Sequence, residues 1–420
     1  MKKIALIVFA ALAAAFSLKA QNDAREEVFA DIEKTGGVHY MYPMNQPAPT
    51  AAPKGYKAFY LSHVGRHGAR FALGSTIYNG QWSTWSRAHT LGWLTPEGEE
   101  IYEAWAALMP NVLHREGNLT QKGQAQHKYI ASQIYKNYPD VFAGPTHASA
   151  VSTVSHRVIV SMFTFLSELD NLDSDFMFDA DYGYPYQDYL LPEIIDQPRV
   201  WPDSVRQKLD VFMAERVDEQ AILSRWFTQP GHLVSSPYTF LYDLLVVVST
   251  LDNLDCEVPQ KFYSIFTPEE RYNIWEVSNY DSYLLLGRSP EVDNVRTRSM
   301  KALLKDFIDK TEEDLASGEV QLRLRFAHDS TLMPFLSLVG VNDWGVVVSC
   351  PDELTKHWRT FEIPMGANLQ LIFFKNKKQP GDILFQLLLN GVEATLPLEM
   401  AAPGSFYRWD DLKAVSAALL

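Results

Sequence analysis

The stretch that most constrains this chain is residues 58–70, where an apolar run, Ala-Phe-Tyr-Leu-Ser-His, is followed at once by Val-Gly-Arg-His-Gly-Ala-Arg. The apolar run predicts a β-strand, so Arg66, His67 and Arg70 stand just beyond a strand end. Arginine stays charged and presents a planar fork of N–H donors that fits phosphate oxygens. The glycines beside His67 let the backbone turn sharply and approach a ligand closely. The stretch predicts an oxyanion pocket with His67 at its floor. The alternative is a strand–loop junction whose arginines pair with carboxylates.

Two later segments repeat this arrangement. Residues 146–151 read as a strand, followed by Ser-Thr-Val-Ser-His-Arg and a helix that begins near Val158. A Ser/Thr-rich turn into a helix offers backbone N–H groups, hydroxyls and the cation of Arg157 together. Residues 321–326 alternate between polar and apolar, which predicts a strand, and His328 and Asp329 follow it. Taken alone, each segment is also explained by a solvated arginine or a structural His-Asp pair.

The pattern Arg-His-Gly-Ala-Arg at 66–70 resembles the signature of the histidine acid phosphatases, the larger branch of the histidine phosphatase superfamily. The segment 117–123, Gly-Asn-Leu-Thr-Gln-Lys-Gly before a helix, is similar to a second family pattern, and Arg157 and the His-Asp pair match two more. The tail is also similar, with a predicted strand pair, 366–374 and 383–389, and Asn-Gly and Leu-Pro after it. The resemblance extends over residues 56–400, close to the bacterial phytases and multiple inositol-polyphosphate phosphatases.

The resemblance implies a role for each site residue. His67 is the nucleophile that becomes a phosphohistidine. The phosphate-binding residues are Arg66, Arg70, Arg157 and His328. Asp329 is the proton donor to the leaving oxygen, and because it must be protonated for that, we expect an acidic optimum. No metal and no cofactor are implied.

The motif region bears on the substrate. Many inositol-phosphate-cleaving members continue the motif with an aromatic residue, Pro and soon a Lys, whereas here Phe71 is followed by Ala72 and the next lysine is Lys122. The His-Asp pair looks more like bacterial phytases and glucose-1-phosphatases than like the His-Ala-Glu of the multiple inositol-polyphosphate branch. We expect a small phosphorylated substrate, first an inositol polyphosphate such as phytate, with glucose 1-phosphate or another sugar phosphate as the alternative. Further candidate cations are Arg87, His89, Lys122, His127 and Arg296.

Two readings outside this class remain. A phosphate-ester binding protein would keep the pocket and lack turnover, but pure binding does not need both His67 and Asp329. A phosphotransferase similar to phosphoglycerate mutase is disfavoured by the His-Asp pair and by the export signal described next.

The N-terminus reads as a secretory signal peptide, residues 1–20, with lysines first, an apolar stretch from Ile4 to Phe16, and a small residue, Ala20, at the cut. The apolar stretch is too short to span a bilayer, so we expect export to the periplasm or the extracellular space and no stable membrane insertion after cleavage. A retained N-terminal anchor is the alternative.

Cys256 and Cys350, the only cysteines, either pair or remain free.

The charge balance excludes one class of partner. The first 20 residues hold three lysines and no acidic residue, so the other 400 carry 34 basic and 51 acidic side chains, a net charge of −17. Nucleic acid is therefore not expected as a partner. A negative protein that handles an anionic substrate must concentrate its arginines locally.

The resemblance and the element pattern together predict an α/β fold: a histidine-phosphatase-like three-layer core with a central mixed sheet, plus an α-helical cap. We expect the core at 21–169 and 291–420, with part of the cap from 71–118, and a mainly α-helical cap insertion at 170–290. Residues 21–57 are expected to wrap the surface, and 71–93 and 170–202 to be loops. Predicted helices are 96–108, 121–138, 158–169, 203–217, 238–251, 268–286 and 292–315.

Overall fold

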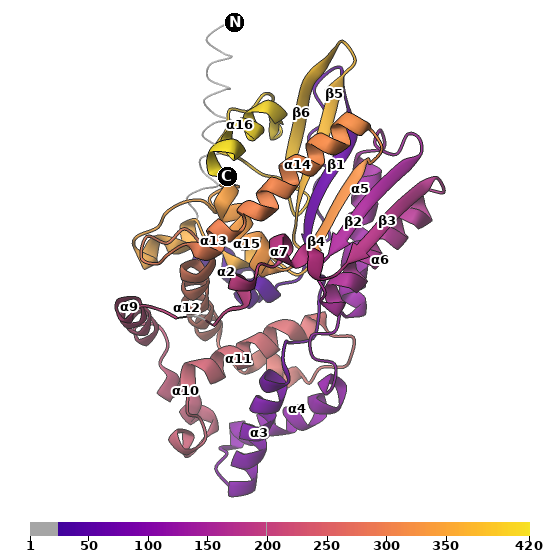
Figure 1. Cartoon of the computed structure of the whole chain (residues 1–420). Coiled ribbons are helices and arrows are strands. Elements are labelled where there is room, and N and C mark those ends of the chain that lie inside the picture. Colours follow the sequence, from indigo (N-terminus) through magenta and orange to yellow (C-terminus); the bar gives the residue numbers. More distant parts are fainter. Residues whose placement is uncertain (1–23, 199) are drawn as a thin grey trace, which may run out of the picture.

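The centre of the molecule is a mixed β-sheet (Figure 1) in a computed structural model that describes residues 24–198 and 200–420. The predicted signal peptide lies outside the described residues. The strands lie in the order β3-β2-β4-β1-β5-β6-β7, with β8 beside β6. Their bounds are β1 Tyr56–Arg66, β2 Thr146–Ser152, β3 Phe176–Tyr182, β4 Leu322–Ala327, β5 Asn368–Asn376, β6 Gln379–Leu389, β7 Val392–Glu393 and β8 Phe406–Arg408. The predicted α/β class with a central mixed sheet is confirmed.

Strands β1, β4 and β2 run parallel, and their register decides where their ends lie. Arg66 at the end of β1 is opposite Ala327 of β4, and Phe326 of β4 is opposite Ser152 of β2. Because parallel strands end at the same edge of a sheet, the three polar segments that follow them begin side by side.

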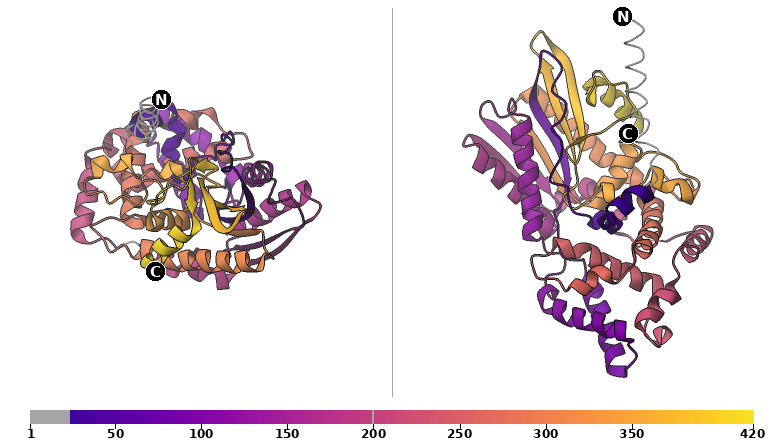
Figure 2. Two further views of the ribbon diagram at one scale, coloured as in Figure 1. Left: turned by 90° about the horizontal axis from the view of Figure 1, so that it is seen from above. Right: turned by 180° about the vertical axis from the view of Figure 1, so that it is seen from behind.

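Helices cover both faces of this sheet (Figures 1 and 2). The side chains on one face of β4 are apolar, and they pack in a cluster with α5 (Gln121–Asn137) and α6 (His156–Leu172). The alternate set faces α14 (Lys301–Ser317), where Arg323 and Arg325 form ion pairs of 2.5 Å and 2.6 Å with Asp314 and Asp306. The alternation that predicted this strand thus separates an apolar face from an ion-paired face.

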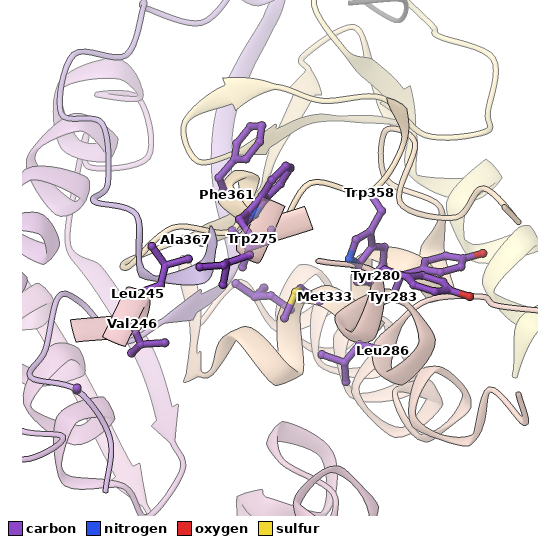
Figure 3. Packing of buried hydrophobic residues seen from close by; sticks show 14 of the residues in the cluster. Leu245, Val246, Trp275, Tyr280, Tyr283, Leu286, Met333, Trp358, Phe361 and Ala367 are labelled. Carbon is purple, nitrogen blue, oxygen red and sulfur yellow. The ribbon is translucent and has the colours of Figure 1, made fainter. Parts of the chain in front are cut away.

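A group of helices lies beyond the polar strand ends (Figure 1): α3 Ser75–Leu91, α4 Pro96–Val112, α9 Asp203–Ala214, α10 Glu219–Trp226, α11 Pro237–Thr250 and α12 Pro268–Leu286. One hydrophobic cluster joins them to the sheet region. Figure 3 shows part of it, with Leu245 and Val246 of α11 near Ala367 and with Met333 of α15 (Asp329–Val339) between α11 and α12.

The remaining helices are α2 Ala24–Ala30, α7 Gln187–Leu190, α8 Glu193–Asp196, α13 Val295–Ser299 and α16 Trp409–Leu419.

The expectation of a loop at 71–93 is wrong, because α3 occupies most of it. Glycine, serine and threonine lower the intrinsic helix propensity of this stretch, but tertiary packing outweighs propensity. Trp85 is fully buried, and its ring centroid lies 4.6 Å from that of Phe227.

The surface leader expected at 21–57 is also partly wrong. Four of the eight residues of its segment η2, Ile32–His39, are buried, and Thr35 accepts a 3.0 Å hydrogen bond from Arg271 of α12. Two adjacent glycines make this approach possible. A Cβ on Gly36 would lie 3.0 Å from Ser249, and Gly37 has a φ of +54°.

Residues 170–202, expected as loop, contain β3 and the short helices α7 and α8. Strand β3 pairs with β2 and forms an edge of the sheet, and most of its side chains are exposed. A strand with so few buried residues carries little hydrophobic pattern to reveal it. The predicted helix 292–315 is two helices, α13 and α14, that meet at Met300. No described helix is both long and apolar enough to cross a bilayer.

Candidate active site

Backbone hydrogen bonds fix His67 at the polar end of the sheet. Its N–H donates to the carbonyl of Ala327 at 3.1 Å, and its own carbonyl accepts from Gly366 at 2.8 Å. His67 therefore lies between the end of β4 and the start of β5. The sequence segments around 67, 157 and 328 are brought together here.

The motif loop rests on the N-terminus of α5. Thr120 caps this helix by accepting from the N–H of Gly123 at 3.1 Å, and its hydroxyl donates to the carbonyl of Ala69 at 3.1 Å. A Cβ on Gly68 would lie 2.4 Å from the carbonyl oxygen of Gly123, and a Cβ on Gly123 would lie 2.2 Å from that of Ala69. Only glycine at both positions allows this contact, which explains the spacing of the two motifs.

One hydrogen bond determines the tautomer of His67. Its Nδ1 lies 2.9 Å from the carbonyl oxygen of Gly68, which can only accept, so Nδ1 carries the proton and Nε2 keeps its lone pair. Burial, then the positive charges of Arg66 and Arg157, hold the pKa of His67 well below its ordinary value of 6.5. The imidazole is therefore neutral and keeps a free lone pair on Nε2 even in acid.

Arg66 is completely buried and is held from one side. Its Nη1 donates to the carbonyl of Ile363 at 2.9 Å and to that of Val38. Its Nη2 lies 3.5 Å from Oδ1 of Asp329, and Nε and Nη2 make no hydrogen bond within the described residues. The guanidinium thus keeps donors for a further acceptor.

Arg70 and Arg157 add two more guanidinium groups. Arg70 is 3% exposed and donates to the carbonyl of Phe71 at 2.9 Å. Burial, together with the charges of Arg66 and Arg157, lowers the pKa of Arg70 to about 9. Arg157, in the first turn of α6, approaches Nδ1 of His328 at 3.4 Å through its Nη2.

His328 is buried and held from two sides. Because the guanidinium of Arg157 can only donate, Nδ1 of His328 is the acceptor, and Nε2 carries the proton toward the hydroxyl of Thr153 at 3.1 Å. Burial and Arg157 lower the pKa of His328 to about 3, so this ring is neutral too.

Asp329 begins α15, and a quarter of its side chain is exposed. Burial alone would raise its pKa, but Arg66 and Arg70 outweigh that effect and lower the pKa of Asp329 to about 2. Asp329 is therefore ionised in the free protein.

The charges near His67 do not balance. Arg66 and Arg70 are both buried and positively charged, and the rings of His67 and His328 are neutral. The single negative charge of Asp329 offsets only part of the charge of the two arginines. A buried excess of positive charge with unused N–H donors favours binding of an anion. The geometry therefore provides an anion site that faces a neutral nucleophilic nitrogen.

Comparison with solved structures supports this description at the level of the fold. A multiple inositol polyphosphate phosphatase of Bifidobacterium longum, solved with phosphate, superposes with a TM-score of 0.72 at 18% identity, covering 92% of this chain and 98% of that one. The phytase from D. castellii gives a TM-score of 0.73 at 16% identity, covering 92% and 85%. The Hafnia alvei phytase gives 0.57 at 12%, covering 88% and 98%. The chain has the fold of these phosphatases.

This phosphatase fold is shown by structure and not by sequence similarity. No protein family model matches the chain, and no curated protein is similar to it in sequence. The fold implied by the short motifs is confirmed, whereas the role of each residue is a matter for proposal.

Sequence reasoning missed residues that support the site within this phosphatase fold. His39 is buried, and burial and the charges of Arg70 and Arg66 lower its pKa to about 3. It lines a cavity of about 630 Å³ together with Asp329. A sequence signal that could have identified this segment is the Gly36-Gly37 pair, which permits close backbone packing.

Three of the other candidate cations make contacts elsewhere. Lys122 donates to the carbonyl of Asp252 at 2.7 Å, His89 pairs with Glu99 at 2.7 Å, and Arg296 donates to the carbonyl of Gln197 at 2.7 Å. His127 is buried with its ring 5.8 Å from that of Phe326, and Arg87 is exposed.

Within residues 24–198 and 200–420, no group of three or more His, Cys, Asp or Glu side chains is arranged to hold a metal ion. Cys256 is partly buried, Cys350 is exposed, and both are free thiols.

Proposed function

We propose that this protein is a phosphoric monoester hydrolase that works through a phosphohistidine on His67. The observation that carries the proposal is the tautomer of His67: its Nδ1 is committed to Gly68, and its Nε2 lone pair is available beside buried arginines. Phosphoryl transfer needs an in-line nucleophile, positive charge around the equatorial oxygens and a proton for the leaving oxygen. The site offers a group for each need.

In the first step the substrate phosphate binds to the donors of Arg66, Arg70 and Arg157. Nε2 of His67 attacks phosphorus, the bond from phosphorus to the ester oxygen breaks, and that oxygen takes a proton from Asp329. The guanidinium groups stabilise the charge that develops on the phosphoryl oxygens.

The proton on Asp329 requires an explanation, because this carboxyl is ionised in the free protein. A phosphate monoester has a second pKa of about 6, so its monoanion can bring the proton into the site. The bound phosphate offsets the charges of Arg66 and Arg70, and burial then favours the neutral carboxylic acid.

In the second step water attacks the phosphorus of the phosphohistidine and the bond to Nε2 breaks. Asp329, ionised after the first step, accepts the proton of the water. His67 returns to its neutral form, and inorganic phosphate is released.

Two substrate classes are proposed for this reaction. Inositol polyphosphates are supported by the fold shared with phytases and with an inositol polyphosphate phosphatase solved with inositol hexasulfate. Sugar phosphates such as glucose 1-phosphate are supported by Ala72 and by the absence of a lysine soon after the motif. Both are small phosphorylated molecules that fit the anion site.

Location and domain division are part of the proposal. The leader at 1–20 supports export to the periplasm or the extracellular space, where a neutral His67 would allow turnover in acid. We assign the phosphatase core to 21–169 and 291–420, and the helical cap to 170–290 with part of 71–118, except that β3 within 170–290 belongs to the sheet of the core. The acidic mature chain supports the absence of a nucleic-acid partner.

The test is phosphate release by the purified protein at a pH of about 5, with 4-nitrophenyl phosphate, inositol hexakisphosphate and glucose 1-phosphate as substrates. We expect release from the aryl phosphate and from at least one of the others. Saturable phosphate binding without release would identify a binding protein. Label transferred to a second ester, with no free phosphate formed, would identify a mutase-like phosphotransferase.

A further inference from the structure

The cavity beside Asp329 is large enough to receive the alcohol part of a substrate. Its volume is about 630 Å³, and its walls come from η2, α9, α11, α12 and the start of α15. Small-molecule sites have volumes of about 300–1,000 Å³. Since Asp329 is the proposed proton donor to the leaving oxygen, the group attached to that oxygen must extend into this cavity.

The charge of the cavity wall is opposite to that of the phosphate clamp. Among the described residues that line it, none is lysine or arginine, whereas three are aspartates besides Asp329: Asp210, Asp243 and Asp281. Asp243 lies on α11 and is partly buried, and this burial raises its pKa. Asp210 is on α9 and is exposed.

The cations on the helices that form the wall do not face the cavity. Helix α9 carries Arg206 and Lys208, which are both exposed and are not among the described residues that line the cavity. Helix α11 contains no lysine or arginine, and α12 contains only Arg271. Both terminal nitrogens of Arg271 donate to the carboxylate of Glu33 at 3.0 Å, and its Nε donates to Thr35. Its charge is therefore committed to η2.

We infer that the cavity selects substrates with a single phosphate and an uncharged, hydroxyl-rich alcohol, so that a sugar monophosphate is preferred over an inositol polyphosphate. This inference rests on the proposed function, because it takes the clamp around His67 as the site of the transferred phosphate.

The physical reason is repulsion between like charges. When one phosphate of inositol hexakisphosphate occupies the clamp, the remaining phosphates must lie near the carboxylates of Asp210 and Asp243, without a lysine or arginine in the described wall to offset them. A sugar ring instead carries hydroxyl groups, which can donate hydrogen bonds to the same carboxylates.

The wall also offers surface suited to the carbon skeleton of a sugar. Tyr238 and Tyr242 both line the cavity, and their rings stack with centroids 6.3 Å apart. Leu245, Val246 and Met333 line it as well and appear together in Figure 3. Apolar and aromatic surface with a few polar groups is typical of a pocket for a neutral ligand.

The experiment compares kcat/KM of the full chain on glucose 1-phosphate and inositol hexakisphosphate, with 4-nitrophenyl phosphate as the reporter of the reaction itself. For the wild type we expect the glucose ester to be favoured by about tenfold or more. Asp243→Asn and Asp210→Asn remove charge with little change of shape, and each should raise the relative efficiency on inositol hexakisphosphate by roughly threefold to tenfold. Asp411→Asn, exposed on α16, is the matched control and should leave the ratio unchanged.

The outcomes separate this inference from the proposed function. If the protein cleaves the aryl phosphate and prefers inositol hexakisphosphate over glucose 1-phosphate, the inference is wrong and the phosphatase proposal stands. A ratio that neither aspartate variant changes also overturns it. Activity on none of the three esters overturns the proposed function itself. Two separate variants, each checked by circular dichroism, keep the test valid if one of them does not fold.

Discussion

The ring of His328 stands edge-on to the ring of His67, with centroids 5.7 Å apart and planes at 71°. His328 is held in that position by Thr153 at 3.1 Å and by Arg157 at 3.4 Å. Its lowered pKa keeps it uncharged, so the proposed nucleophile has a neutral neighbour on this side. The positive charge of the site is thereby left to the arginines, which surround the position expected for the phosphoryl oxygens.

Replacing His67 by alanine should abolish phosphate release, because no other group takes the place of its Nε2. Acid-quenched wild type incubated with radiolabelled substrate should carry label on protein, and the variant should carry none. The control is His89→Ala, since His89 is an exposed residue paired with Glu99, and it should behave as wild type. Near-normal turnover by His67→Ala would contradict the phosphohistidine mechanism.

The pH profile of kcat/KM should lack an acid limb between about pH 6.5 and pH 5. An unperturbed histidine is about 97% protonated at pH 5 and would lose its nucleophile, but the lowered pKa of His67 keeps it neutral there. On the alkaline side, efficiency should fall above a pH of about 6 as the substrate loses the proton that Asp329 needs. A fall of about sixteenfold on acidification from 6.5 to 5 would show that His67 titrates normally.

Arg157→Ala should lower catalytic efficiency by roughly tenfold to a few hundredfold, because a charge-assisted hydrogen bond contributes about 1.5–3 kcal/mol. The loss has two sources, the missing contact to phosphate and the freed ring of His328. Steady-state kinetics on one ester measures it, with Arg408→Ala as the control. Arg408 is exposed and pairs with Asp382, far along the chain from the site. Unchanged efficiency would remove Arg157 from the site.

Asp329→Asn should slow esters with poor leaving groups severely and an aryl phosphate much less. An alkoxide must be protonated as it leaves, whereas an aryl oxide is a stable anion. Single-turnover measurements of both substrates are needed, because hydrolysis of the phosphoenzyme can otherwise limit the rate. Equal losses on the two substrates would mean that the proton comes from another group.

Gly68→Ala should both destabilise the protein and reduce activity. The new Cβ would lie 2.4 Å from the carbonyl oxygen of Gly123, which is backbone and cannot rotate away. We expect a cost of about 1–3 kcal/mol in the free energy of unfolding. Turnover should fall by about tenfold or more as His67 is displaced. Gly80→Ala in α3 has nothing within 4 Å of its Cβ and should be neutral or slightly stabilising. Thermal melting and phosphate release measure both effects, and an unaffected Gly68→Ala would contradict the close packing of the loop on α5.

The sequence by itself identified the segments that carry the candidate site residues and the edge of the sheet at which these segments lie. Arg66 is the last residue of β1, and His67, Arg157 and the His-Asp pair each come after a strand whose pattern is local and readable. Parallel strands end at one edge, so the fold class places these segments side by side, and the observed register of β1, β4 and β2 agrees with this. Helices with strong caps, such as α12 from Pro268 to Leu286 with its capping box of Thr267 and Glu270, were also predictable.

Only the tertiary structure decided the charge and proton state of these groups and the character of the space around them. The neutral rings, the ionised carboxyl of Asp329 and the fixed guanidinium of Arg66 depend on burial and on carbonyls from Val38 and Ile363, which lie far away in the chain. The acidic cavity wall likewise combines η2 with α9, α11 and α12. No local pattern encodes such contacts, because desolvation and charge act through space between segments that only packing brings together.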